Sequence, residues 1–242
     1  MELVAGGIAV ALASFLGGVT GFGYSLVATP LLLLDGYSLP FVVTVNLALA
    51  LITRISVAVR FRHSMWPRRV ALLIGGAVPG LYLGVVVLGA VNPTDIKIAA
   101  GVVTMIAALL IARSVNAPPP RRTIPGAAAV AGFLGGFLGA STSLNGVAPV
   151  LLLARDKASP RSFLADLAVY FVGANTIGLA ILAARGTLEQ DALSPAFLVW
   201  LPGSLLGNWL GTTLGPRLPE AAFRRLTLAI VFVAGGVTAI TA

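Results

Sequence analysis

Cysteine is absent from the 242 residues, and histidine occurs once. Without cysteine the chain has no disulfide, no iron–sulfur cluster and no thiol nucleophile. The single histidine, His63, lies within the arginine-rich stretch 60–69, where we expect it to be solvated. A metal site built from histidine and carboxylates is therefore not expected, and we predict neither a metal nor a cofactor.

Charged side chains are also scarce, at 10% of the residues, whereas 58% are hydrophobic and the mean hydropathy is +1.00. A soluble domain carries about 25% charged residues because its surface faces water. Apolar runs of about 20 residues cross a bilayer as helices, while a membrane β-barrel would alternate over segments of about ten residues. The sequence contains runs of the first kind, so it predicts an all-α integral membrane protein.

Turn-forming residues separate eight apolar segments. These segments cover residues 3–34, 40–59, 69–91, 96–112, 124–153, 162–184, 193–215 and 221–241. The clearest break is a linker, 114–123, that contains three consecutive prolines and two arginines. We therefore divide the chain into a first repeat, 1–113, and a second repeat, 124–242, with four segments each.

The two repeats share a glycine motif. Residues 15–21, Phe-Leu-Gly-Gly-Val-Thr-Gly, match residues 133–139, Phe-Leu-Gly-Gly-Phe-Leu-Gly, at an offset of 118. A proline and a leucine-rich run follow in both halves, and a later Pro-Gly pair with a second glycine recurs at 79–84 and 202–207. Matches in the same order indicate an internal duplication, which is typical of transporters.

The first segment of each repeat is too long for one span. Residues 3–34 would make a helix of about 48 Å, against a hydrocarbon core of about 30 Å. The middle of this segment, 17–23, is rich in glycine, which disfavours a helix, and 135–143 repeats the pattern. Each segment is therefore either a broken helix that crosses the membrane or two half-helices that dip in and return.

Basic residues distinguish these two topologies. If both long segments re-enter, one side holds thirteen basic residues, in the stretches 60–69, 113–122, 155–161 and 217–225. The other side then holds only Lys97 and Arg185, whereas eight crossing segments would divide the charges eight to seven. The positive-inside rule favours inverted repeats with six spans, two re-entrant hairpins and cytoplasmic basic stretches in the plasma (inner) membrane. A fully crossing bundle with parallel repeats is the alternative. The same rule accounts for the net charge of +8 without nucleic acid as a partner.

Small polar side chains occupy both glycine-rich breaks. The helix that follows a break presents free N–H groups and a partial positive charge, which bind anions. We therefore predict an oxoanion site between the half-helices. Its candidates are Thr20, Gly21, Gly23, Tyr24, Ser25, Ser141, Thr142, Ser143 and Asn145. In the alternative interpretation the glycines serve helix packing and the hydroxyl groups bond to their own backbones.

Ionisable residues within spans are functional candidates by default. Arg54 could contribute positive charge to an anion pathway, and Asp166 could accept a coupling proton, with Asn46 opposite it in the other repeat. Alternatively, Arg54 extends to the membrane surface and Asp166 caps its helix. Weaker candidates, because polar side chains often only link membrane helices, are Tyr170, Asn175 and Asn208.

The glycine motif at 17–23, followed by Pro30 and four leucines, resembles the first motif of the TauE/SafE family, the toluene sulfonate uptake permease group. The second copy, 135–149, and Arg62-His63 ahead of 79–84 fit as well, so the likeness covers nearly the whole chain. It implies a small permease for sulfur-containing anions such as sulfite or sulfoacetate. The second copy departs from the family pattern at residues 141–145, where a run richer in glycine is common. This difference could alter which anion fits the site.

These observations predict a secondary transporter that exports a small sulfur-containing anion (sulfite, a sulfonate or sulfoacetate). No ATP-binding G-x-x-x-x-G-K-[ST] motif is present, so a gradient would supply the energy. The expected partners are the anion and the lipid bilayer, and a homodimer is left open. The alternative is a non-transporting membrane subunit or assembly factor that binds partners through its basic loops. An intramembrane enzyme is not expected, because only Asp166 is plausibly buried among the residues able to catalyse.

Overall fold

The computed structural model describes residues 2–92, 124–193 and 195–215, with isolated positions at 94, 95, 98, 102, 106, 229 and 233. The linker 114–123, the basic stretches 113–122 and 217–225, Lys97 and nearly all of the predicted spans 96–112 and 221–241 lie outside the described residues.

The described part of the chain is helical and contains no strand. Its helices are α1 (Glu2–Thr20), α2 (Gly23–Leu34), α3 (Leu39–Phe61), α4 (Pro67–Ala90), α6 (Ala127–Thr142), α7 (Val147–Arg155), α8 (Pro160–Ala184) and α9 (Ala196–Leu214), with 3-10 turns at Arg62–Ser64 and Gln190–Leu193. Within the described residues, four stretches are long and apolar enough to cross a membrane: Leu3–Thr20, Leu39–Ser64, Pro67–Ala90 and Pro160–Ala184. The predicted class, an all-α membrane protein, is confirmed.

The helices α3 and α8 begin in the same way. The Ser38 hydroxyl accepts a hydrogen bond from the Phe41 N–H at 3.3 Å, and the Ser159 hydroxyl accepts one from the Ser162 N–H at 3.3 Å. A proline follows within the first helical positions in both cases. Serine at the N-cap and proline in the first turn are strong signals for the start of a helix. The residues at which α3 and α8 begin can therefore be predicted from the sequence.

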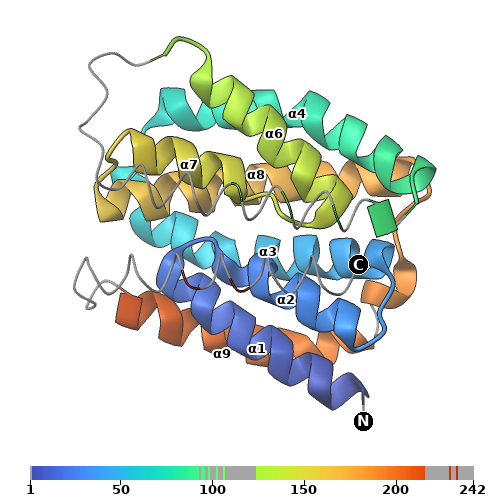
Figure 1. The fold of residues 1–242 in the computed structure, drawn as a ribbon. Helices are drawn as coiled ribbons and strands as arrows, with labels where there is room; N and C mark the ends of the chain where they lie inside the picture. The colour runs from blue at the N-terminus through green and yellow to red at the C-terminus, as the bar shows by residue number, and fades with distance from the viewer. Residues whose placement is uncertain are drawn as a thin grey trace.

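Segment 3–34 forms a hairpin of α1 and α2. The indole Nε1 of Trp200 donates a hydrogen bond to the Leu3 carbonyl at 2.8 Å, and its ring lies 5.5 Å from the Tyr37 ring. Leu3 belongs to the start of α1 and Tyr37 follows the end of α2. The chain therefore returns to the end of the bundle from which α1 departs, as Figure 1 shows at its right-hand side.

Segment 124–153 forms a second hairpin, of α6 and α7, from the opposite end. Ile124, just before α6, and Arg155, the last residue of α7, line the same groove. Figure 1 places this open end at the left, together with the α3–α4 connection. The ion pair between Arg69 and Asp156, at 4.0 Å, joins the start of α4 to the end of α7 and agrees with this placement.

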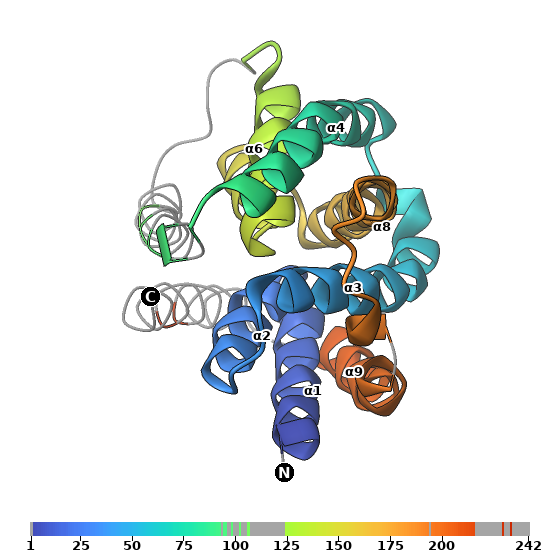
Figure 2. The same ribbon diagram turned by 90° about the vertical axis from the view of Figure 1, so that its right-hand side faces the viewer.

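The helices pack in two groups, and each group contains helices from both halves of the sequence (Figure 2). One group contains α1, α2, α3 and α9 around a core that includes Val10, Leu32, Leu49 and Trp200. The other contains α4, α6, α7 and α8, and its core extends across α3 to Phe22 of the first break. Consequently α9 packs with the first half of the chain, and α4 packs with the second.

Glycines allow the closest helix contacts. A Cβ added to Gly76, Gly80 or Gly84 of α4 would overlap backbone atoms of α6. The same holds against α1 for Gly207 and Gly211 of α9 and for Gly215, the residue that follows α9. Small residues at this spacing let membrane helices approach backbone to backbone. Gly80 packs on Phe133 and Gly211 packs on Phe15, and these two phenylalanines are equivalent in the two glycine motifs. The contacts therefore pair Gly80 with Gly211, whereas the sequence match of 79–84 with 202–207 pairs Gly80 with Gly203.

Candidate functional site

The first helix break lies at Gly21 and Phe22. Gly21 has a φ of +85°, in the left-handed region that favours glycine. The Thr20 hydroxyl accepts a hydrogen bond from the Gly23 N–H at 2.9 Å and donates one to the Leu16 carbonyl at 2.8 Å. Thr20 therefore stabilises the break by satisfying backbone groups on both sides of it.

The second break covers residues 143–146. Ser143 adopts a φ of +66°, an uncommon conformation for a residue with a side chain. The Asn145 Nδ2 donates a hydrogen bond to the Asn175 Oδ1 at 2.6 Å, and the Tyr170 hydroxyl donates to the Asn145 carbonyl at 3.3 Å. Two residues of α8 thus hold the second break in place.

The two breaks are in contact. A Cβ added to Gly146 would lie 3.2 Å from the Phe22 Cβ and 3.1 Å from the Phe171 Cζ. Phe22 belongs to the first break, Gly146 to the second, and Phe171 to α8. The hairpins that enter from opposite ends of the bundle therefore meet beside one aromatic side chain.

Arg54 of α3 lies at this meeting point. Its side chain is buried, with 2% of its surface exposed, and its Cζ lies 5.8 Å from the centre of the Phe171 ring. A Cβ added to Gly17 would lie 2.9 Å from Arg54 Nη2 and 2.8 Å from the Tyr24 backbone nitrogen. The guanidinium group is therefore next to the first turn of α2. The backbone N–H groups of that turn have no acceptor within the helix.

This position concentrates positive charge. Arg54 has no carboxylate partner among the described residues, and its Nη1 is buried without a hydrogen-bond partner. The N-terminus of α2 adds the positive end of a helix dipole. Burying a guanidinium group whose Nη1 donor has no partner costs free energy, so this position is a candidate for binding an anion.

Three other buried polar atoms in the described part of the chain lack a partner: Ser143 Oγ, Asn175 Nδ2 and Asn208 Oδ1. Ser143 lies in the second break, and Asn175 is hydrogen-bonded to Asn145 of that break. Asn208 of α9 donates from Nδ2 to the Thr53 carbonyl at 3.2 Å, one residue before Arg54. This bond orients the amide, so its Oδ1 remains as an acceptor.

The other polar candidates make local contacts. Tyr24 donates its hydroxyl hydrogen to Asn46 Oδ1 at 2.9 Å, and Asn46 Nδ2 donates to the Thr29 hydroxyl at 3.1 Å. The Ser141 and Thr142 hydroxyls both donate to carbonyls one turn earlier, at 2.7 Å. Ser141 and Thr142 therefore bond to the backbone of their own helix, as the alternative to an anion-binding role predicts. Ser25, next to Tyr24 in α2, is buried.

Asp166 lies in a separate ionic cluster. Its Oδ1 accepts a hydrogen bond from the Trp66 N–H at 2.8 Å, and its Oδ2 accepts one from Arg69 Nε at 2.7 Å. Arg69 also donates to the Ser162 hydroxyl at 3.1 Å, and its Cζ lies 5.0 Å from the centre of the Trp66 ring. Among the described residues, no hydrogen bond or ion pair joins Asp166 to Asn46, or either of them to Arg54.

Sequence reasoning gave little weight to Asn175 and Asn208 and overlooked Phe171. One signal was available for Asn175: the serine caps of α3 and α8, Ser38 and Ser159, are 121 residues apart, and so are Arg54 and Asn175. Asn208 has no comparable signal, because its importance arises from the packing of α9 against α1 and α3.

No group of three histidine or acidic residues in the described ranges could hold a metal ion. Neither a curated protein nor a solved structure gives a significant match to the chain. The sequence model of the family described as "Sulfite exporter TauE/SafE" matches residues 6–238, nearly the full length. The protein therefore belongs to the sulfite exporter TauE/SafE family of membrane transporters.

Proposed function

We propose that this chain is a gradient-driven secondary transporter that exports sulfite or a related sulfonate, bound where the two helix breaks meet. The observation that carries the proposal is Arg54, a buried cation whose Nη1 has no partner and whose guanidinium lies beside the first turn of α2. A planar guanidinium group presents donors that match an oxoanion. We assign no catalytic role to any residue.

The polar atoms around the breaks support an anion with one hydrogen-bond donor. Arg54 Nη1 and Asn175 Nδ2 are donors, and the Ser143 hydroxyl can donate or accept. Asn208 Oδ1 only accepts, so a fully deprotonated oxoanion facing it would be repelled. Hydrogen sulfite, or a sulfonate with a hydroxyl or amino group, supplies both the negative charge and the donor.

The arrangement of the two halves of the chain supports a mechanism in which the central site opens alternately to the two sides of the membrane. We propose that residues 1–113 and 124–242 are inverted repeats, each contributing one re-entrant hairpin. The matching serine caps of α3 and α8 and the opposed directions of the two hairpins support this (Figure 1). Opposed motion of two such halves around a fixed central site is the general scheme for inverted-repeat transporters.

The orientation in the membrane is proposed from charge. The stretches 60–69 and 155–161 lie at one end of the described bundle (Figure 1), and Arg185 follows the far end of α8, the helix that begins at Pro160. The positive-inside rule favours the plasma (inner) membrane with the first end in the cytoplasm. Coupling of transport to a proton at Asp166, with Asn46 as its counterpart, stays a prediction.

A ligand panel tests the function. The purified protein in detergent is heated with sulfite, sulfate, thiosulfate, sulfoacetate, taurine, phosphate or chloride, at acidic and at neutral pH. A ligand at a hundred times its Kd stabilises the folded state by about 2.7 kcal/mol, so binding raises the melting temperature. We expect a rise with sulfite or sulfonates and none with chloride.

The competing function, a non-transporting membrane subunit, predicts a flat panel at both pH values. It also predicts that alanine at Ser25, Ser143 or Asn145 is harmless, whereas alanine at Arg60 or Arg68 disrupts a complex. Sulfur-anion binding that is lost on replacing Ser143 or Asn145 would exclude that alternative.

A further inference from the structure

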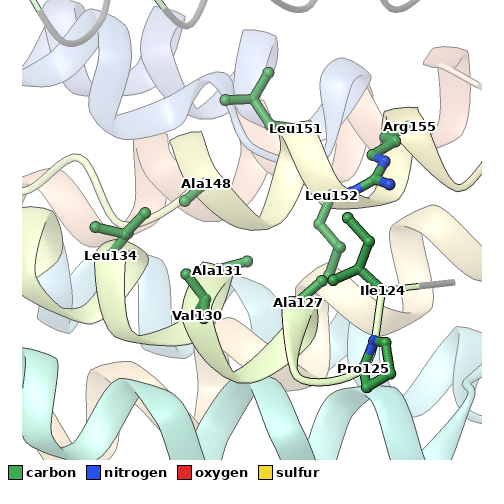
Figure 3. A pocket seen from close by; sticks show the side chains of 10 residues that line it. All are labelled: Ile124, Pro125, Ala127, Val130, Ala131, Leu134, Ala148, Leu151, Leu152 and Arg155. Atoms are coloured by element: carbon green, nitrogen blue, oxygen red, sulfur yellow. The ribbon is translucent and has the colours of Figure 1, made fainter.

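The second hairpin encloses an apolar groove that lies apart from the anion site (Figure 3). The groove runs between α6 and α7 near their open end and has a volume of about 410 Å³. Of the ten described residues that line it, nine are apolar and the tenth is Arg155, the last residue of α7. Exposed fractions of 55% for Ile124 and 60% for Val130 show that it opens to the surroundings of the protein.

The first hairpin differs at the corresponding place. There the Trp200 indole contacts Gly6 and Gly7 of α1, bonds to the Leu3 carbonyl at 2.8 Å and packs against Tyr37. Its own chain therefore fills the space at the open end of that hairpin. Among the described residues, no aromatic side chain lines the groove of the second hairpin, so none fills it in the way that Trp200 fills the first.

Arg155 indicates which molecule fits. The side chain is partly buried at the mouth of the groove, and among the described residues it has no ion-pair or hydrogen-bond partner. An apolar groove within a bilayer takes a hydrocarbon chain, and an unpaired arginine at its mouth takes an anionic head group. Basic residues at the membrane surface attract anionic lipids in this way.

We propose that the groove between α6 and α7 binds one anionic phospholipid, with an acyl chain along the apolar lining and the phosphate on Arg155. The lipid does for the second hairpin what Trp200 does for the first: it holds the open end at a fixed separation. This lipid site is independent of the anion that is transported.

The test compares lipid binding by matched variants. Native mass spectrometry of the full chain in detergent, titrated with phosphatidylglycerol, gives the Kd of the first bound lipid. We expect Arg155→Gln to weaken it about fivefold, the effect of one basic residue near an anionic lipid. Arg161→Gln, an exposed arginine of the same basic stretch, is the control and should bind as the wild type does.

A second variant tests the groove itself. Val130→Trp places a large ring in the groove from an exposed position, so it should fold normally and also lose the tight lipid. Glycerol phosphate, the head group without acyl chains, should not compete. Unchanged binding in both Arg155→Gln and Val130→Trp, or full competition by glycerol phosphate, would overturn the proposal.

Discussion

The side chain of Arg54 has an environment that would favour the binding of an anion. It is surrounded by an aromatic ring, the first turn of a helix and a glycine backbone, and no carboxylate among the described residues pairs with it. Cation–π attraction to Phe171 contributes about 2 kcal/mol at a desolvated site, less than the cost of burying an isolated cation. The proposed anion between the breaks would offset the difference.

Asn208 should control which anions bind. Asn208→Leu removes the one unpartnered atom in the described part of the chain that can only accept, so the affinity for hydrogen sulfite should fall about tenfold, the size of one hydrogen bond to a charged group. Binding of methanesulfonate, which carries no donor, should change little. Calorimetric titration at mildly acidic pH measures both affinities, and Thr213→Val, on the same helix, is the control. An equal loss for both anions would contradict the role assigned to Asn208.

Asp166 should contribute to stability through Arg69. Removing one partner of a buried ion pair leaves an uncompensated charge, so Asp166→Asn should lower the free energy of unfolding by about 3 kcal/mol. The double variant Arg69→Met with Asp166→Leu should recover much of the loss, and denaturation in detergent measures both. A proton-coupling role predicts a different result: Asp166→Asn would keep normal stability and lose the pH dependence of transport.

At the scale of elements, the sequence indicated the helix breaks well and the helix contacts poorly. Glycines and small hydroxyl residues marked both breaks, because these residues disfavour a continuous helix. The contacts between the two halves could not be predicted from the sequence. Matching the two repeats pairs Gly80 with Gly203, whereas the helix contacts pair Gly80 with Gly211. Hydroxyl residues such as Ser141 were also ambiguous, because a membrane helix can satisfy them locally.

The glycine contacts between α4 and α6 should be intolerant of side chains. Gly80→Val would drive a side chain into the Phe133 carbonyl, and backbone cannot move aside as a flexible side chain can. We expect a destabilisation of at least 1–3 kcal/mol, the usual cost of overpacking, seen as a lower melting temperature and yield. Gly75→Val, on the open face of the same helix, is the control because no atom lies within 4 Å of its added Cβ. Equal stability of the two variants would contradict the close contact.

At the scale of the whole molecule, the hairpins determine which loops share a side of the membrane. The absence of cysteine makes the test direct, because any introduced thiol is the only one. Single cysteines at Ser38, His63, Lys157 and Arg185 can be labelled in intact cells with an impermeant maleimide. We expect Ser38→Cys and Arg185→Cys to be labelled from outside, and the other two only after the membrane is permeabilised. Labelling of position 38 together with 157 would instead indicate eight crossing segments.

The central claim, that Arg54 binds a transported sulfur anion, is tested most directly by flux through the purified protein. Proteoliposomes loaded with sulfite are diluted, and its release is followed for the wild type, Arg54→Gln and Arg60→Gln, an exposed arginine of the same helix. We predict release by the wild type and Arg60→Gln, and only the rate of empty liposomes for Arg54→Gln with a normal melting temperature. Release by Arg54→Gln at the wild-type rate would remove Arg54 from the pathway, and no release by the wild type would contradict sulfite transport.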